Sequence, residues 1–464
     1  MWVRLPAVSR PIALAALAVA LLAIGARAPG AVTYPLWQDE VATARIMEEP
    51  TFGRMLDHVR ETESTPPAWY SLAWSAHKAG LSVEAVRWLS VLFGGALGAV
   101  TLLFASRFLP FWAAVLAGTA SAFAWQLVNR GHELRAYALY ALLSILFALL
   151  LERAAQRPGR GALACLALTV ALGLLTHYFF ALALATGLLW LWTSDTARRA
   201  RLRVTAALST GILPALLWLP GFADQVENQR YSWVASFDLL KAVAVYSTFF
   251  WNAGALYVKA DDVAIPALEA VLRVGIFFGV LAGAVALVQQ QPGPARLCAL
   301  LATVPVIAAS VVWLLGAEVF VTRNLLCAAP FAGICLAALS TLLPRRIAVA
   351  GGAAIVALLG LGLVQERTLR PPPYDELAGQ LVASGWTRAD VVNVIGGAHR
   401  LSYLGDVHAI SSPVGWYLPG HPVFRPTRET TCPLYVIDGL ERRAFSRPCG
   451  GRTADGQPLR ASAP

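Results

Sequence analysis

Two adjacent carboxylates, Asp39 and Glu40, stand shortly after the first long apolar run of the chain. A positioned carboxylate can take a proton from a hydroxyl group, so this pair is a candidate general base. Glu133, between two later apolar runs, is a third candidate. Ionisable groups beside such apolar segments are rare in membrane proteins and commonly functional. The sequence therefore offers proton-accepting groups where a membrane enzyme would use them.

Cations also stand near the ends of apolar runs. They are Arg130, Arg135 and Arg323. An anionic phosphate in a low-dielectric site needs fixed cations, and the planar guanidinium group pairs with two phosphate oxygens at once. Together with a carboxylate base, these residues suit the transfer of a group from a lipid phosphate to a hydroxyl group. Charged residues at span ends can also do no more than mark the water interface, and that alternative stays open for Arg130 or His177 taken alone.

The elements that must position these residues are apolar runs long enough to cross a bilayer. Of the 464 residues, 57% are hydrophobic and only 14% are charged, and the mean hydropathy is +0.60. This composition excludes a soluble enzyme and a disordered protein. Runs of about 17–22 apolar residues match a hydrocarbon core of about 30 Å, so we expect an all-α polytopic membrane protein with about eleven transmembrane helices. Their ranges are 12–28, 88–106, 111–128, 136–151, 162–176, 178–193, 204–220, 267–288, 297–315, 325–343 and 347–364.

The arginines predict how the chain is oriented in the membrane. With a cytoplasmic N-terminus, one set of short breaks between the runs is rich in arginine and contains only two acidic residues, Glu152 and Asp195, as the positive-inside rule requires. This set contains Arg107, Arg153, Arg157, Arg160, Arg198, Arg199, Arg201, Arg203, Arg296, Arg345 and Arg346. The large loops 29–87 and 221–266, the candidate site residues and the C-terminal tail then lie outside. Topology thus accounts for the net charge of +10, and we expect no nucleic-acid partner.

The N-terminal run has a second interpretation. Ala26-Arg27-Ala28 near its end resembles the small-residue cleavage site of a secretory signal. A retained first span serves the same purpose in a multispan protein, and we expect retention.

The chain changes character after Arg370-Pro371-Pro372-Pro373. Alternating and β-branched stretches over 391–395 and 434–437, set among turn residues, indicate strands. We therefore expect a transmembrane domain over 1–365 and a small extracytoplasmic α/β or β-rich domain over 366–464. A disulfide between Cys432 and Cys449 would fit an oxidising compartment, and two unrelated reduced thiols are the equal alternative.

Several short motifs occur in a characteristic order on the predicted outer side. They are Trp37-Gln38-Asp39-Glu40, Thr65-Pro66-Pro67-Ala68-Trp69-Tyr70, Arg87-Trp88-Leu89-Ser90, Glu133-Leu134-Arg135-Ala136-Tyr137-Ala138-Leu139, Thr176-His177-Tyr178-Phe179 and Arg323-Asn324-Leu325-Leu326. Their order and spacing resemble the bacterial dolichyl-phosphate-mannose–protein mannosyltransferase-like glycosyltransferases of family 39, which are related to the lipid A aminoarabinose transferases and have the GT-C fold. The resemblance covers about 1–200 well and 300–340 more weakly, and it does not reach the tail.

The resemblance implies a GT-C-like enzyme that transfers a sugar, with inversion, from a polyprenyl-phosphate donor to an acceptor on the extracytoplasmic face. It implies that Asp39 is the catalytic base and Glu40 its neighbour. The donor-binding residues that it implies are Glu133, Arg135, Tyr137, His177 and Arg323, to which the phosphate argument above adds Arg130. The chain departs from the family pattern at Thr65, where many relatives have His, and at His132, where they have Gln. These departures leave the sugar and any metal role of that position open.

The expected partners are a lipid-linked sugar donor, an envelope acceptor (protein, lipid or glycan) and the bacterial inner membrane. No cofactor is certain; a divalent cation is optional, because the phosphate already leaves as a stabilised anion. Asp261-Asp262 could hold such an ion, although a solvated acidic loop is the simpler interpretation. Two alternative functions stay open: a transporter or flippase of lipid-linked sugars, and an inactive relative that binds lipid. Neither inverted repeats nor helices broken at the midplane are evident, as a transporter would require.

Overall fold

In the computed structural model, the structure describes residues 9–227, 234, 236–251, 267–290, 293–317, 319–368, 373–385, 392–395, 412–420, 434–438 and 443–447. The chain divides into two compact units. The first contains residues 1–31 and 50–368, and the second contains residues 32–49 and 369–464.

Each of the eleven apolar runs contains a helix of the first unit. These helices are α1 (Arg10–Thr33), α5 (Val83–Ala105), α6 (Phe111–Phe123), α8 (Tyr137–Gln156), α9 (Arg160–Thr176), α10 (Phe180–Thr193), α11 (Arg201–Leu216), α14 (Ala267–Gln290), α15 (Pro294–Leu314), α16 (Ala329–Thr341) and α17 (Arg345–Thr368). The all-α polytopic architecture expected from the composition is therefore confirmed.

The number of spans stays a prediction. Among the described residues, six helices are long and apolar enough to cross a membrane alone: α1, α5, α8, α14, α15 and α17. A seventh span results if α11 and α12 (Leu219–Glu227), bent by 57°, are taken together. The other apolar helices have 10–17 residues. At 1.5 Å per residue these are shorter than a hydrocarbon core of about 30 Å, so each needs adjoining residues to span it.

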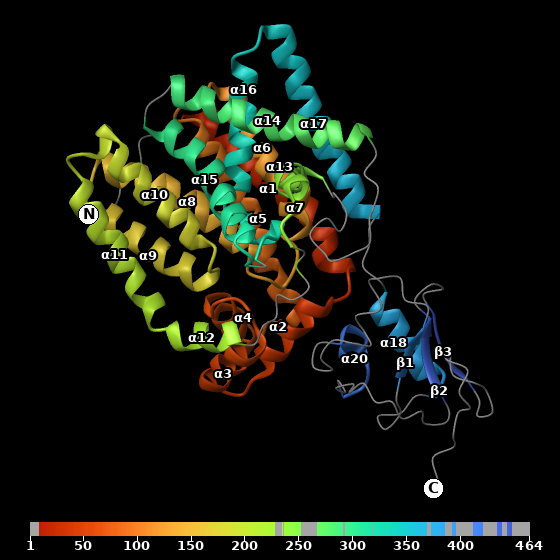
Figure 1. Ribbon diagram of the computed structural model, residues 1–464. Helices are drawn as coiled ribbons and strands as arrows, with labels where there is room; N and C mark the ends of the chain where they lie inside the picture. Colours follow the sequence, from red (N-terminus) through yellow and green to blue (C-terminus); the bar gives the residue numbers. More distant parts are fainter. Residues whose placement is uncertain are drawn as a thin grey trace. The chain divides into compact units, whose positions relative to one another are not determined.

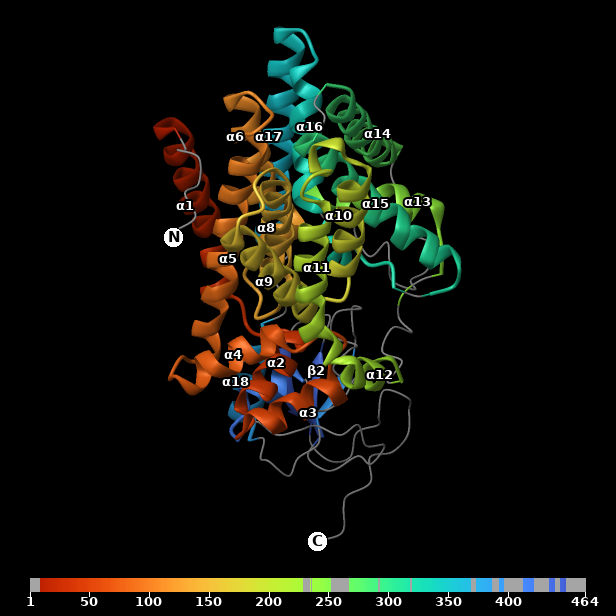
Figure 2. The same ribbon diagram turned by 90° about the vertical axis from the view of Figure 1, so that its left-hand side faces the viewer.

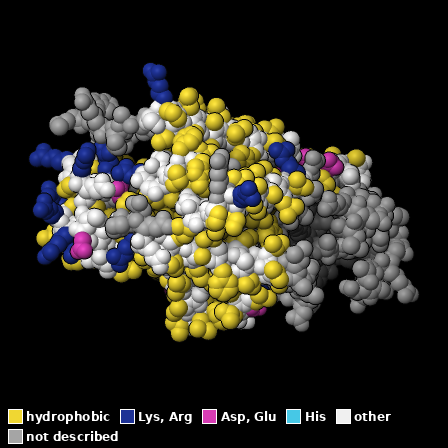
Figure 3. Space-filling model, turned by 90° about the horizontal axis from the view of Figure 1, so that it is seen from above, with side chains coloured by type: hydrophobic (Ala, Val, Ile, Leu, Met, Phe, Trp, Pro, Cys, Tyr) yellow, Lys and Arg dark blue, Asp and Glu magenta, His cyan; other side chains and the backbone are white. Residues whose placement is uncertain are grey.

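Helix α8 lies at the centre of the bundle. It packs against α5, α9, α10 and α16, and 72% of its most apolar segment is buried, against 11% for α17. Figures 1 and 2 show these helices running alongside one another. The outer helices expose leucine and valine, such as Leu17 and Leu21 of α1 and Leu361 of α17. Figure 3 shows hydrophobic side chains over much of the face seen there, with Lys and Arg gathered toward one edge. Such an apolar exterior requires lipid around it.

The segments predicted as outer loops contain helices. Within 29–87 these are α2 (Gln38–Glu48), α3 (Phe52–Thr62) and α4 (Ala68–Lys78). Helices α3, α4 and α12 lie together at one end of the bundle (Figures 1 and 2). The Gln225 amide of α12 donates hydrogen bonds to the backbone oxygens of Val59 and Thr65 and so ties α12 to α3 and to the segment before α4.

Helix α13 (Leu239–Phe250) was not expected within the predicted loop 221–266. It packs against α14, α7 (Trp125–Asn129) and α17, and its Tyr246 hydroxyl donates to the backbone oxygen of Ala302 at 2.8 Å. Twelve residues are too few for a span, so composition alone could not separate this buried helix from a loop.

The second unit combines helices with a three-stranded sheet. Its elements are α2, α18 (Tyr374–Ala383), β1 (Val392–Ile395), α20 (Pro413–Tyr417), β2 (Leu434–Asp438) and β3 (Arg443–Arg447). Strands β1 and β2 are parallel, with Val394 opposite Ile437; β2 and β3 are antiparallel, with Val436 opposite Phe445. The predicted strand segments coincide with β1 and β2. Cys432 and Cys449 lie outside the described residues.

The division of the chain differs from the predicted boundary in one respect. Residues 32–49, placed by sequence in the first domain, group with the tail. The Leu36 amide donates to the Tyr417 hydroxyl at 2.7 Å, and the Arg45 guanidinium lies over the Trp416 ring at 5.1 Å. These contacts join segments more than 360 residues apart, which no local pattern can indicate.

Candidate functional site

The turn from α7 to α8 holds an ion pair. Arg130 Nη1 lies 2.6 Å from Glu133 Oε1, and the Arg130 guanidinium lies over the ring of Tyr137, 5.7 Å from its centroid. Only 18% of the Arg130 side chain and 7% of the Glu133 side chain are exposed. Since α7 ends at Asn129 and α8 begins at Tyr137, the turn between them presents these groups at one end of the central helix.

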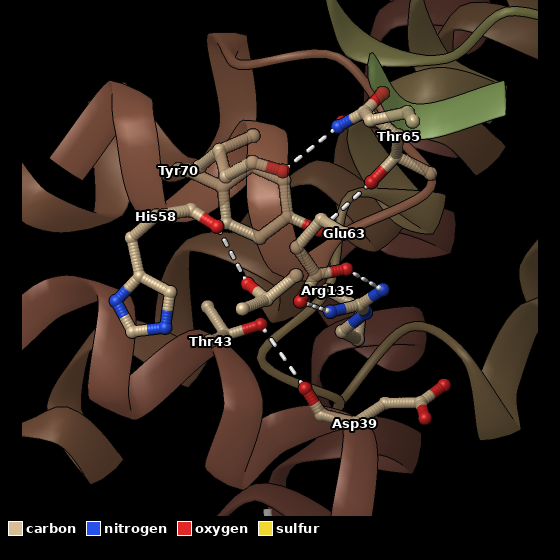
Figure 4. A network of polar contacts seen from close by, with 10 residues as sticks. Asp39, Thr43, His58, Glu63, Thr65, Tyr70 and Arg135 are labelled. Atoms are coloured by element: carbon tan, nitrogen blue, oxygen red, sulfur yellow. Dashed lines mark hydrogen bonds and ion pairs between the residues drawn. The ribbon is translucent and has the colours of Figure 1, made fainter. Parts of the chain in front are cut away.

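Arg135 makes a bidentate ion pair with Glu63, the residue that follows α3. Nη1 and Nη2 of Arg135 each lie 3.0 Å from a different oxygen of the carboxylate, and both side chains are buried. Figure 4 shows the two groups facing each other. The sequence predicted Arg135 as a phosphate ligand; in the structure, Glu63 already occupies the guanidinium fork.

Tyr70 of α4 completes this part of the site. Its ring lies beneath the Arg135 guanidinium at 5.8 Å, and its hydroxyl is 2.7 Å from the Thr65 hydroxyl (Figure 4). Burial, the largest effect, raises the pKa of Tyr70 well above its usual value, so the phenol stays neutral near pH 7. Glu63 was not among the predicted site residues; its acidic side chain just before Thr65-Pro66-Pro67 was the available signal.

His177 lies in the turn between α9 and α10, against the aromatic face of α8. Its ring stacks on Tyr140 with centroids 4.3 Å apart and planes 10° apart, and Tyr137 lies at 6.2 Å. The Phe179 backbone amide donates to Nδ1 at 3.3 Å. Burial, reinforced by the charges of Arg323 and Arg135, lowers the pKa of His177 to about 3. The imidazole is therefore neutral.

Arg323 comes from the short helix η2 (Thr322–Leu325). The Tyr140 hydroxyl donates to the backbone oxygen of the next residue, Asn324, at 2.9 Å, and Thr322 contacts Thr248 of α13. The α7–α8 turn, the α9–α10 turn, η2 and the α3–α4 connection thus converge on the same end of α8. The structure brings together Arg130, Glu133, Arg135, Tyr137, His177 and Arg323, which the sequence singled out from three separate regions.

Asp39 and Glu40 belong to the second unit, in the first turn of α2. The Glu40 carboxylate accepts a hydrogen bond from the Trp37 amide at 3.2 Å and so caps its own helix. Asp39 is half-buried, and its backbone oxygen accepts from the Thr43 hydroxyl (Figure 4). Carboxylates in the first turn of a helix also interact favourably with the helix dipole. The two residues thus differ in their bonds within α2: Glu40 caps the helix through its carboxylate, whereas Asp39 accepts the Thr43 hydroxyl through its backbone oxygen.

A buried arginine supports the α7–α8 turn from behind. Arg27 of α1 is fully buried, and its Nη1 and Nη2 donate to the backbone oxygens of Ala23, Ala122 and Leu127 at 2.8–3.0 Å. Helix α6 ends at Phe123 and α7 begins at Trp125, so Ala122 has a carbonyl that the broken helix cannot satisfy. A side chain at Gly94 or Gly131 would clash with the guanidinium. The motif that resembles a cleavage site thus lies within a packed helix.

His132 in the same turn lies behind the ion pairs. Burial, with the charges of Arg87, Arg27 and Arg130, lowers its pKa to about 3. Its Nδ1 is 3.8 Å from the Glu366 carboxylate of α17, and its ring packs against Gly30, where a Cβ atom would lie 2.6 Å away. His132, which stands where many members of the family have Gln, is therefore a buried residue that joins α1 and α17 to the turn.

Within the part of the chain that the structure describes, no group of three or more His, Cys, Asp or Glu side chains could hold a metal ion. Asp261-Asp262 lie outside it. A divalent cation stays a prediction.

Comparison with known proteins identifies the fold. No family profile and no curated protein matches the sequence. Solved structures do match. ArnT from Cupriavidus metallidurans is 14% identical, with TM-scores of 0.54 in the apo state and 0.53 bound to undecaprenyl phosphate; the similarity covers 89% of this chain and 84% of ArnT. The apo oligosaccharyltransferase from Archaeoglobus fulgidus is 12% identical with a TM-score of 0.56, covering 90% of this chain and 65% of that protein.

The chain has the GT-C fold. These neighbours are glycosyltransferases of the membrane, and the apolar helices of this chain agree with a multi-pass membrane protein. At such low identity the similarity concerns the GT-C fold and not the substrates. The function of the chain is therefore inferred from the residues of the site and their geometry.

Proposed function

We propose that this protein is a glycosyltransferase of the bacterial inner membrane. It transfers a sugar from a polyprenyl-phosphate donor to a hydroxyl group of an envelope acceptor on the extracytoplasmic face, with inversion at the anomeric carbon. The GT-C fold and the convergence of the predicted donor-binding residues on one end of α8 support this function. Of these two observations, the convergence of the donor-binding residues on α8 is the stronger support for the proposed function.

The charge of the cluster supports an anionic ligand. Three guanidinium groups, Arg130, Arg135 and Arg323, stand against two carboxylates, Glu63 and Glu133, which leaves one positive charge over these five side chains. A polyprenyl-phosphate sugar is a phosphodiester with one negative charge. We assign Arg323 to the phosphate because its charge acts on the buried ring of His177, while the two ion pairs orient the surrounding groups.

The reaction needs a base and a stabilised leaving group. We propose that Asp39 takes the proton of the acceptor hydroxyl as its oxygen attacks the anomeric carbon. The bond from that carbon to the phosphate oxygen breaks, and polyprenyl phosphate leaves with the electron pair. Arg323 stabilises the negative charge that develops on the departing phosphate. Glu40, as a helix-capping carboxylate, supports the geometry of Asp39.

Replacing the base tests this proposal. Asp39→Asn keeps the shape of the side chain but removes its basicity, so transfer should slow by at least a hundred-fold, since a general base contributes about 10²–10⁴-fold. Purified protein is assayed with a radiolabelled polyprenyl-phosphate sugar and a hydroxyl acceptor, and donor binding is measured in parallel. Donor affinity should stay within a few-fold. If Asp39→Asn turns over like the wild type, the base lies elsewhere, and Glu133 becomes the candidate.

A further inference from the structure

His177 holds a buried polar atom that the fold does not use. Its side chain is 3% exposed, and among the described residues no hydrogen-bonding partner lies against Nε2. Leaving such a nitrogen unsatisfied in a buried position costs stability. The ring is nevertheless held in place, because it stacks on Tyr140 at 4.3 Å and Phe179 donates its amide hydrogen to Nδ1. The structure thus fixes the direction in which Nε2 points without giving it a partner.

The bond at Nδ1 decides what Nε2 can do. Nδ1 accepts a hydrogen from the Phe179 amide, so it carries none itself. In a neutral imidazole the hydrogen then resides on Nε2. His177 is neutral at physiological pH because burial and two nearby guanidinium groups disfavour its protonated form. Nε2 is consequently a hydrogen-bond donor, and its natural ligand is an acceptor oxygen.

The charges around His177 select the kind of oxygen. Among the described residues, the charges of Arg323 and Arg135 act on the ring. Tyr137, Tyr140 and Phe179 surround it with aromatic surface that brings no negative charge. A positive potential favours an anionic oxygen over a hydroxyl group. A neutral donor adds a hydrogen bond to such a ligand without adding another positive charge to the buried site.

We propose that His177 binds a non-bridging phosphate oxygen of the polyprenyl-phosphate donor through Nε2–H, as a neutral imidazole. The inference rests on the proposed function and sharpens it, since it assigns His177 to the phosphate and not to the sugar. Tyr140 is the positioning residue, because it stacks under the imidazole while its hydroxyl holds the η2 segment that carries Arg323.

Two substitutions separate the two nitrogens of the ring. His177→Asn retains a polar group at the position of Nδ1 for the Phe179 amide and removes the donor at Nε2. His177→Gln places an amide nitrogen near the position of Nε2. Binding is measured for three probes in detergent: polyprenyl phosphate, a polyprenyl-phosphate sugar and the uncharged polyprenol. His177→Asn should bind polyprenyl phosphate and the sugar donor about tenfold or more weakly, because a hydrogen bond to a charged group is lost. His177→Gln should recover most of this affinity, and polyprenol binding should not change.

The outcomes distinguish the inference from the function on which it rests. Loss of affinity for the sugar donor alone would place Nε2 on a sugar hydroxyl and overturn the proposal. Equal affinity of His177→Asn and wild type for polyprenyl phosphate would overturn it as well. A wild-type protein that binds neither phosphate probe would refute the proposed function itself. Histidine ¹⁵N spectra of the wild type at pH 7 need no substitution: they should show hydrogen on Nε2 and a shift of that nitrogen on addition of polyprenyl phosphate. Hydrogen on Nδ1 would contradict the assignment.

Discussion

The buried ion pair between Arg135 and Glu63 should contribute strongly to the integrity of the site. Its two hydrogen bonds are 3.0 Å long, and the side chains are only 7% and 5% exposed. Glu63→Gln keeps the shape of the side chain but leaves the Arg135 charge without its counter-ion. Breaking one partner of such a pair costs about 3–5 kcal/mol, because the remaining charge stays buried. We therefore expect a loss of this size in the free energy of unfolding, measured by SDS titration in mixed micelles.

The first unit offers a matched exposed pair as a control. Arg60 and Asp57 lie 3.7 Å apart on α3, with side chains 36% and 65% exposed. Asp57→Asn should cost no more than about 1 kcal/mol, because solvent screens an exposed pair. In the double variant Glu63→Gln with Arg135→Met, the loss should be smaller than the sum of the single losses, since no unpaired charge remains. If Glu63→Gln is no less stable than Asp57→Asn, or if the losses of the two single variants add in the double variant, the buried ion pair does not stabilise the site as expected.

Three further predictions concern orientation and the helix that carries the candidate base. In a cysteine-free background, a cysteine near Gly397 should react with a membrane-impermeant thiol reagent in intact cells, whereas one near Arg199 should react only after lysis; labelling at Arg199 in intact cells would overturn the orientation. Tyr417→Phe removes the 2.7 Å bond to the Leu36 amide and should lower kcat several-fold with little change in the KM for donor, as α2 loosens; an unchanged kcat would separate α2 from catalysis. Glu40→Gln keeps an acceptor oxygen for the Trp37 amide, so its kcat should fall far less than that of Asp39→Asn, and an equal fall would give Glu40 a direct role.

Much of the fold was predictable because membrane helices obey a local rule. Each apolar run must satisfy its own backbone hydrogen bonds in lipid, so composition and length alone placed a helix in each of the eleven predicted runs, although the number of spans stays a prediction. The short buried helix α13 escaped this rule, because its burial depends on packing against α7, α14 and α17 and not on its length. The break between α6 and α7 escaped it as well, since Arg27 from another helix satisfies the carbonyls that the break leaves open.

For the candidate site as well, some features follow from the sequence and others only from the tertiary structure. By itself, the sequence determined which residue types could bind a phosphate or accept a proton, and that they cluster at the ends of apolar runs, because charges are costly elsewhere in a membrane protein. Only the tertiary structure decided how these groups are paired. Glu63 forms a bidentate ion pair with Arg135, and Glu40 caps its own helix. The Phe179 amide donates to Nδ1 of His177, so that Nε2 carries the hydrogen and is a donor. Pairing depends on distances of a few ångströms between segments far apart in the chain, and residue order alone does not specify those distances.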